Sequence, residues 1–208
     1  MAQPYSARSR AIEPFHVMAL LARANELQAA GHDVIHLEIG EPDFTTAEPI
    51  IKAGQAALSA GKTRYTAARG IPELRGAISG FYQQRYGLDI DPERIMITPG
   101  GSGALLLTSS LLVDPGKHWL LADPGYPCNR HFLRLVEGAA QLVPVGPDMR
   151  YQLTPDLVER YWDQDSVGAL VASPANPTGT VLSRDELAGL STACLLYTSD
   201  AADDSLRV

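Results

Sequence analysis

The chain has 208 residues, 45% of them hydrophobic and 20% charged, which suits one globular domain or one domain and part of a second. A formal net charge of −7 argues against a nucleic-acid-binding surface. The N-terminus lacks the apolar segment of a secretory signal, and no apolar run has the length of a membrane span. Cys128 and Cys194 have neither metal-type nor disulfide-framework spacing. We therefore expect a cytoplasmic protein without metal, membrane or nucleic-acid partners.

Helical and extended patterns alternate in the first part of the chain. Apolar spacing predicts a helix over Phe15–Ala30, and a strand is predicted over Val34–Ile39, just before Gly40. A proline near its start and a glycine after its end predict a second helix over Ala47–Ala60. Pro72 opens a third helix, whose expected buried stripe consists of Leu74, Ala77, Ile78, Phe81 and Tyr82.

The same alternation continues through the second part of the chain. The predicted strands are Ile95–Ile97, Trp119–Ala122, Gln141–Val145 and Val167–Ala172. The predicted helices are Ala104–Val113, Asn129–Val136, one capped by Thr154 before Pro155, and one that begins at a capping box from Ser183 to Glu186. Strands that alternate with helices predict an α/β fold with a mostly parallel sheet.

A glycine-rich turn, Gly100–Gly103, joins the predicted strand Ile95–Ile97 to the following helix. The free N–H groups at a helix start, together with the helix dipole, form an anion site, and glycine lets a phosphate approach the backbone. Ser102 adds a hydroxyl group. The turn is neither a P-loop nor a dinucleotide fingerprint, and many such turns bind nothing. It also comes close to a nucleophile elbow, which would make Ser102 a nucleophile.

Two further turns follow predicted strands at Asp123–Pro127 and Ser173–Gly179. In an open α/β sheet, ligands bind at the carboxyl ends of the strands. Tyr126 offers an aromatic face and Asn176 an amide, so the three turns together suit a planar phosphorylated heteroaromatic ring. Taken singly, Tyr126 could be an ordinary rim aromatic, and Asn176 could simply favour a turn before Pro177.

Six short motifs in register resemble the class I/II aminotransferases, which are fold-type I pyridoxal-phosphate enzymes. The resemblance covers about residues 10–194. The motifs are Gly40-Glu41-Pro42-Asp43-Phe44; Tyr65 with Gly70 and Leu74-Arg75; Tyr82 with Tyr86-Gly87; Thr98-Pro99-Gly100-Gly101-Ser102-Gly103-Ala104-Leu105; Pro124-Gly125-Tyr126-Pro127; and Asn176-Pro177-Thr178-Gly179. The resemblance implies a three-layer sandwich with a mostly parallel sheet, here truncated, and the N-terminal part of a small domain.

The family resemblance implies that the protein binds pyridoxal 5′-phosphate. Tyr126 would stack on the pyridine ring, and Asn176 would bond the phenolic oxygen of that ring. Tyr65 would reach the phosphate of a neighbouring subunit's cofactor, which implies a homodimer. The implied cofactor-binding residues are Tyr65, Gly101, Ser102, Gly103, Tyr126 and Asn176.

The implied activity is transfer of an amino group between an amino acid and a 2-oxo acid. Gly40, through its backbone, and Asn176 would bind the substrate carboxylate. Some relatives use the same scaffold for β-elimination or decarboxylation, and these reactions stay open.

The family's Schiff-base lysine, its pyridinium-pairing aspartate and its carboxylate-binding arginine lie further along the complete sequence. Lys62 and Lys117 are not at the matching position, so no catalytic residue is assigned and an inactive fragment is expected. We expect an N-terminal arm and part of a small domain in residues 1–45, an incomplete cofactor-binding domain in 46–194, and a foreign or frameshifted tail in 195–208.

Two other function classes remain open. An α/β-hydrolase with Ser102 as nucleophile needs a late histidine, but only His118 and His131 follow, both close to Ser102. An aminotransferase-like sensing domain of a transcription regulator would carry a DNA-binding domain ahead of the match, where only about ten residues stand.

Overall fold

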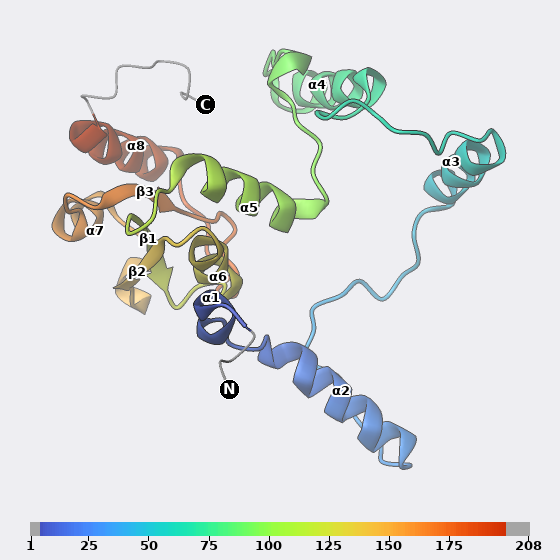
Figure 1. The fold of residues 1–208 in the computed structure, drawn as a ribbon, viewed down its shortest axis with the longest axis horizontal. Helices are drawn as coiled ribbons and strands as arrows, with labels where there is room; N and C mark the ends of the chain where they lie inside the picture. Colours follow the sequence, from blue (N-terminus) through green and yellow to red (C-terminus); the bar gives the residue numbers. More distant parts are fainter. Residues whose placement is uncertain (1–4, 199–208) are drawn as a thin grey trace. The chain divides into compact units, whose positions relative to one another are not determined.

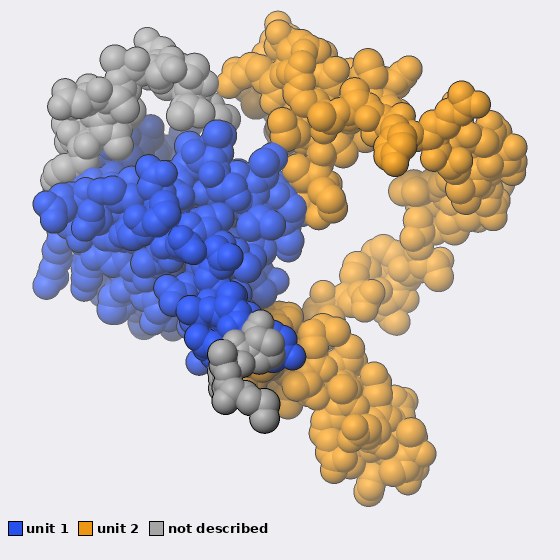
Figure 2. Space-filling view, in the orientation of Figure 1, with its two compact units in different colours: residues 1–13, 101–208 blue, residues 14–100 orange. Residues whose placement is uncertain are grey.

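The computed structural model describes residues 5–198 (Figure 1). Contacts divide the chain into two compact units (Figure 2). The first consists of the residues up to Glu13 together with those from Gly101 onward, and the second is Pro14–Gly100. The domain boundaries expected after residues 45 and 194 stay a prediction.

The first unit is built on a three-stranded parallel sheet (Figure 1). The strands are β1 (His118–Asp123), β2 (Ala139–Pro144) and β3 (Ser166–Leu170), in the order β2-β1-β3. β1 pairs with β2 in continuous register, whereas its pairing with β3 shifts between His118 and Trp119. The predicted α/β fold with a parallel sheet is confirmed, and all three of these strands were predicted.

Helices cover both faces of this sheet. Successive side chains of a strand point to opposite faces, so β1 contributes to two separate clusters. Leu120 is fully buried with residues of α7 (Pro155–Tyr161) and α8 (Arg184–Thr198), while Trp119 and Leu121 pack with Leu133 of α6 (Cys128–Leu135). Each fully buried side chain of this size contributes roughly 1.5–3 kcal/mol to folding. The layers helix, sheet and helix agree with the expected three-layer arrangement.

Both predicted helix caps are present in the first unit. The Thr154 hydroxyl accepts from the Leu157 N–H at 3.3 Å at the start of α7. At the start of α8, the Glu186 N–H donates to the Ser183 hydroxyl at 3.2 Å, and the Ser183 N–H donates to the Glu186 carboxylate at 2.7 Å. The Arg150 guanidinium also pairs with Glu186, and these bonds lower the pKa of Glu186 to about 2. The carboxylate therefore stays ionised and accepts the Ser183 N–H as the second bond of the capping box.

The last helix, α8, reaches into the segment from residue 195 that was expected to be a foreign or frameshifted tail, and it ends at Thr198. A helix nucleated by a capping box gains a hydrogen bond with each added residue. The origin of this segment stays a prediction. The rest of the expected tail, residues 199–208, lies outside the described residues.

The second unit is helical. It contains α2 (His16–Ala29), α3 (Glu48–Ser59), α4 (Pro72–Tyr86) and the short 3₁₀ helix η1 (Pro92–Arg94). α2 and α3 begin and end within one residue of the predicted positions, and α4 begins at Pro72 as predicted. The first unit also holds the short α1 (Ala7–Ala11), in a segment for which no helix was predicted.

The two strands predicted in the second unit are wrong. Val34–Ile39 is irregular, with the side chains of Ile35 and Leu37 82% and 88% exposed. In Ile95–Ile97, the Ile97 N–H donates to Arg69 O at 3.1 Å, but the segment forms no β-ladder with another strand. A strand is stabilised by a partner, and no described strand of this unit can supply one.

The predicted buried stripe of α4 is also largely exposed, and Leu20 of α2 faces solvent as well. Leu20, Leu74 and Phe81 are 59%, 42% and 55% exposed. Among the described residues of the second unit only Arg75 is buried, where its guanidinium donates to Pro92 O at 2.9 Å and to the Glu93 carboxylate at 2.8 Å. This unit therefore has helices of the expected pattern but no apolar core of its own.

Candidate functional site

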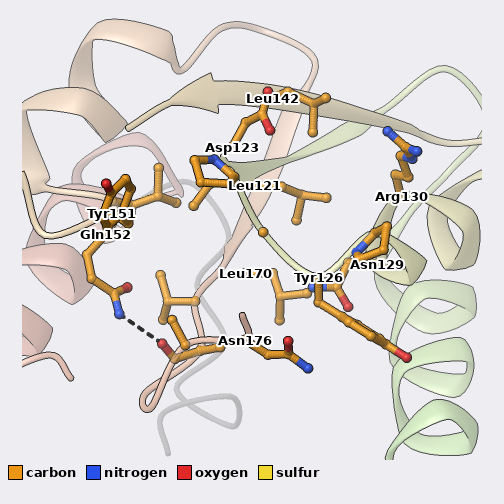
Figure 3. Close-up of a pocket in the computed structure, with 18 residues that line it drawn as sticks. Leu121, Asp123, Tyr126, Asn129, Arg130, Leu142, Tyr151, Gln152, Leu170 and Asn176 are labelled. Carbon is orange, nitrogen blue, oxygen red and sulfur yellow. Dashed lines mark hydrogen bonds between the residues drawn. The ribbon is translucent and has the colours of Figure 1, made fainter. Parts of the chain in front are cut away.

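A cavity opens at the carboxyl ends of β1 and β3 (Figure 3). Its wall includes Asp123 at the end of β1, Leu170 at the end of β3, and two of the predicted site residues, Tyr126 and Asn176. The carboxyl ends of parallel strands are where ligands bind in open α/β sheets. The structure thus brings two turns that are distant in sequence onto one cavity at the expected edge of the sheet.

The turn after β1 sets the position of Tyr126. A Cβ atom on Gly125 would lie 2.5 Å from Ala122 O, so only glycine fits this close approach. The Val145 N–H donates to Asp123 O at 2.9 Å and holds the start of the turn. A hydrogen bond with the Cys128 thiol, and partial burial, raise the pKa of the Tyr126 hydroxyl. The ring is therefore neutral and half-buried, as a stacking surface should be.

The loop after β3 carries Asn176. Within it, the Ala175 N–H donates to Thr180 O at 2.8 Å, and the Gly179 N–H donates to Ala175 O at 2.7 Å. These bonds close the loop on itself, while Asn176 stays exposed at the cavity. In Figure 3 the Asn176 amide and the Tyr126 ring lie on the same side of the cavity. An amide donor beside an aromatic face suits a planar ring that carries an oxygen atom.

The glycines of the expected phosphate turn lie inside a helix rather than before it. α5 (Gly100–Leu112) begins at Gly100, whereas the predicted helix began at Ala104. Gly101, Ser102 and Gly103 therefore form the first helical turn, whose N–H groups have no acceptor within the helix. The first turn holds no acidic residue, and a Cβ atom on Gly101 would meet nothing within 4 Å. This helix start has the open space and the donors that a phosphate group requires.

The other predicted site residues lie in the second unit. Gly40 and Tyr65 each stand in an exposed irregular segment, and Tyr65 lines a shallow hollow with Thr63, Arg64 and Thr66. Their roles toward the cofactor and the substrate stay predictions. Gly101, Ser102 and Gly103 are not among the residues that line the cavity of Tyr126 and Asn176.

One residue of the cavity wall, Gln152, was not predicted from the sequence. Gln152 is 3% exposed and donates hydrogen bonds to the loop of Asn176. Nothing in the sequence distinguishes it, because a single glutamine between apolar residues in a connecting segment has no characteristic spacing. Only the tertiary structure shows that its amide is buried.

Residues 5–198 hold neither a metal-ligand cluster nor a membrane-spanning helix. Among these residues, no three His, Cys, Asp or Glu side chains come together as metal ligands. None of the helices described has both the length and the apolar character to cross a membrane.

The arrangement of His118 does not favour a serine hydrolase. His118 begins β1, at the opposite end of the strand from Asp123 and the cavity. Its Nε2 atom lies 2.9 Å from the Ser166 hydroxyl and 3.2 Å from the Asp163 carboxylate. In a catalytic triad the acid holds the other ring nitrogen, so this cluster has a structural geometry instead.

Comparison with known proteins gives one consistent result. The family described as aminotransferase class I and II matches residues 32–200, past Cys194, where the resemblance was expected to stop. A valine–pyruvate aminotransferase of Mycobacterium tuberculosis is 39% identical over 192 residues, which cover 92% of this chain and 48% of that protein. A (5-formylfuran-3-yl)methyl phosphate transaminase of Methanocaldococcus jannaschii is 42% identical over 173 residues, with coverages of 83% and 45%.

A solved structure agrees with the sequence matches. Aspartate aminotransferase from Thermus thermophilus, solved with maleate, superposes with a TM-score of 0.88 at 32% identity and covers 94% of this chain and 51% of its own. The chain spans about half the length of the curated relatives it matches. From the extent of the family match and the identity to these relatives, we conclude that the chain belongs to the aminotransferase class I and II family.

Proposed function

We propose that this chain is the N-terminal half of a pyridoxal-phosphate-dependent aminotransferase, which transfers an amino group between an amino acid and a 2-oxo acid. The observation that carries the proposal is the meeting of Tyr126 and Asn176 on one cavity at the carboxyl ends of β1 and β3, in a member of the aminotransferase family. The residues present fit such a cofactor: an aromatic face, an amide donor, and a helix start with open space at Gly101.

Each part of the proposed site has its own task. When bound, pyridoxal phosphate supplies an electron sink for the bonds at the amino acid's α-carbon. The first turn of α5 binds the phosphate through backbone N–H groups and the Ser102 hydroxyl. Tyr126 covers one face of the ring, and Asn176 donates its amide to the ring oxygen. The Gly40 backbone and Asn176 orient the substrate carboxylate.

The remaining parts of the proposed enzyme come from the length that this chain does not span. There we place the lysine that holds the cofactor and moves the proton at the α-carbon, the acid beside the ring nitrogen, and the arginine for the substrate carboxylate. Tyr65 would serve the site of a second subunit, so the complete enzyme is a homodimer. We place it in the cytoplasm.

The amino donor is left at the level of its class. The relatives' names cover a valine–pyruvate, an aspartate and a furan phosphate aminotransferase, and these substrates differ in size and charge. What they share is an amino or carbonyl group that exchanges nitrogen, so the proposal is limited to this exchange.

Reconstitution of the full-length enzyme tests the proposal directly. We expect the purified enzyme, incubated with pyridoxal phosphate and then desalted, to keep the cofactor and its visible absorbance. Pyridoxal, which lacks the phosphate, serves as the control and should be lost on desalting, because the start of α5 has nothing to hold. A protein that stays colourless with excess pyridoxal phosphate would contradict the assignment.

Replacement of the stacking ring gives a second test in the full-length enzyme. We expect Tyr126→Ala to weaken cofactor binding by ~0.5–1.5 kcal/mol beyond the loss of contact area, because the ring no longer stacks on the pyridine. Tyr126→Phe keeps the ring and should bind nearly as well as the unaltered protein. The dissociation constants come from absorbance or fluorescence titration. Equal affinity of the alanine variant and the unaltered protein would remove Tyr126 from the site.

A further inference from the structure

Gln152 is a buried amide that holds the loop of Asn176. It lies between η2 (Pro147–Met149) and α7 and is 3% exposed. Its Nε2 atom lies 3.1 Å from Ala172 O, 3.1 Å from Thr180 O and 3.1 Å from the Thr180 hydroxyl oxygen. Figure 3 marks the bond to the backbone at Ala172. One amide group thus reaches both ends of the loop that follows β3.

The loop of Asn176, which the backbone bonds at Ala175 close on itself, is also tied at both of its ends. Ala172 comes just before the loop and Thr180 just after it, so Gln152 joins the two ends. The Leu182 N–H also donates to the Ser173 hydroxyl, at 2.9 Å. Among the described residues, none makes a hydrogen bond with the Asn176 side chain. The position of the Asn176 amide therefore depends on the backbone of its loop.

Burial of an amide is unfavourable unless its hydrogen bonds are made, and here the Gln152 nitrogen finds acceptors for both of its hydrogens. An apolar side chain of similar length could fill the same space without these bonds, but it would leave the oxygens of Ala172 and Thr180 without this donor. The hydrogen bonds to both ends of the loop therefore account for a polar side chain at this buried position.

We propose that Gln152 is a positioning residue, which sets the Asn176 amide in line with the ring oxygen of the cofactor by fixing both ends of the Asn176 loop. The proposal rests on the proposed function, because it needs Asn176 to contact the cofactor. Gln152 itself does not touch the reacting atoms and acts only through Asn176.

A double-mutant cycle in the full-length enzyme tests this inference, with the dissociation constant of pyridoxal phosphate as the readout. Gln152→Met keeps the length of the side chain and removes the donors. We expect it to weaken binding about fivefold in the unaltered background and not at all in the Asn176→Ala background, because residues that act through one contact are not additive. The cofactor analogue 3-deoxypyridoxal phosphate, which lacks the ring oxygen, should bind equally with and without Gln152→Met.

Leu133→Ala is the matched control, because Leu133 is buried in the other core cluster and its loss lowers stability without touching the loop. It should change cofactor affinity by the same factor in both backgrounds. If Gln152→Met does not fold, Gln152→Leu, which is smaller and also has no donor, takes its place in the cycle.

Three results would overturn the inference. A Gln152 variant that weakens binding equally in both backgrounds would show a general structural role. A variant with unchanged affinity would show that the loop needs no such support, while Asn176→Ala alone still weakens binding and keeps the proposed function. An Asn176→Ala enzyme with unchanged affinity would overturn the role of Asn176 in the proposed function together with the inference.

Discussion

Expressed alone, the 208-residue chain should be insoluble, or soluble only in a form that binds a hydrophobic dye and exchanges its amides quickly. We also expect no transamination with any amino acid, because the lysine that the proposed reaction needs is assigned to the part of the relatives that this chain does not span.

The first reason for low stability is the edge of the sheet. In the order β2-β1-β3, the strand β3 pairs with β1 and has no described strand on its other side. Parallel strands are normally buried by neighbours and by helices on both faces, and an open apolar edge invites pairing with other chains. β3, with the sequence SVGAL, carries no charged residue that would discourage such pairing.

The second reason is the apolar surface of the helices. In the second unit, Arg75 is the only buried residue among those described, while large apolar side chains of every long helix face solvent. Examples are Leu20 at 59%, Leu58 at 68% and Phe81 at 55% exposure. α5 adds Leu111, which is 75% exposed. Helices of this kind gain their stability from packing, so those of the second unit need a partner surface outside their own unit.

Thermal unfolding, dye binding and amide exchange of the purified chain measure this expectation. The matched control is the same chain extended by the second half of the full-length enzyme, which should be soluble, melt cooperatively and transaminate. A sharp cooperative melt of the 208-residue chain together with measurable turnover would show that neither the missing half nor its lysine is needed.

Local sequence signals predicted the elements that are stabilised locally. The caps at Thr154 and at Ser183 with Glu186 were predicted because each needs only a few neighbouring residues. The strands β1, β2 and β3 were predicted because their sequences are apolar. In the structure each of them pairs with a neighbouring strand of the sheet. The segments Val34–Ile39 and Ile95–Ile97 have the same apolar pattern and are not strands, since a strand also requires a partner that sequence pattern cannot supply.

The candidate site divides in a similar way. Tyr126 and Asn176 could be predicted, because each stands in a turn that follows a strand, and strand ends of a parallel sheet share one edge. Gln152 could not, because its burial and its hydrogen bonds arise where two segments distant in sequence meet. Gly100–Gly103 was predicted as an anion site, but as a turn before the helix. Glycine lowers helix propensity, so the sequence pattern does not show that these residues form the first turn of α5.

In the full-length enzyme, Gly101→Asp should abolish tight cofactor binding without loss of stability. Gly101 lies in the first turn of α5, and a side chain there meets nothing within 4 Å in the described structure. An acidic residue in a first helical turn is favourable by roughly 0.3–1 kcal/mol, so the folded protein should tolerate it. The same carboxylate would stand where the cofactor phosphate is proposed to bind, and the two negative charges repel.

The size of this effect follows from Coulomb's law. Two unit charges about 5 Å apart at an effective dielectric constant near 20 interact by roughly 3 kcal/mol, which corresponds to a loss of more than about a hundredfold in affinity. Gly101→Asn is the matched control, because it has the same shape without the charge and should lose much less. Titration with pyridoxal phosphate and thermal unfolding of both variants give the two readouts. If the aspartate and asparagine variants bind the cofactor equally well, the phosphate does not lie at the start of α5, since charge is the only property that separates them.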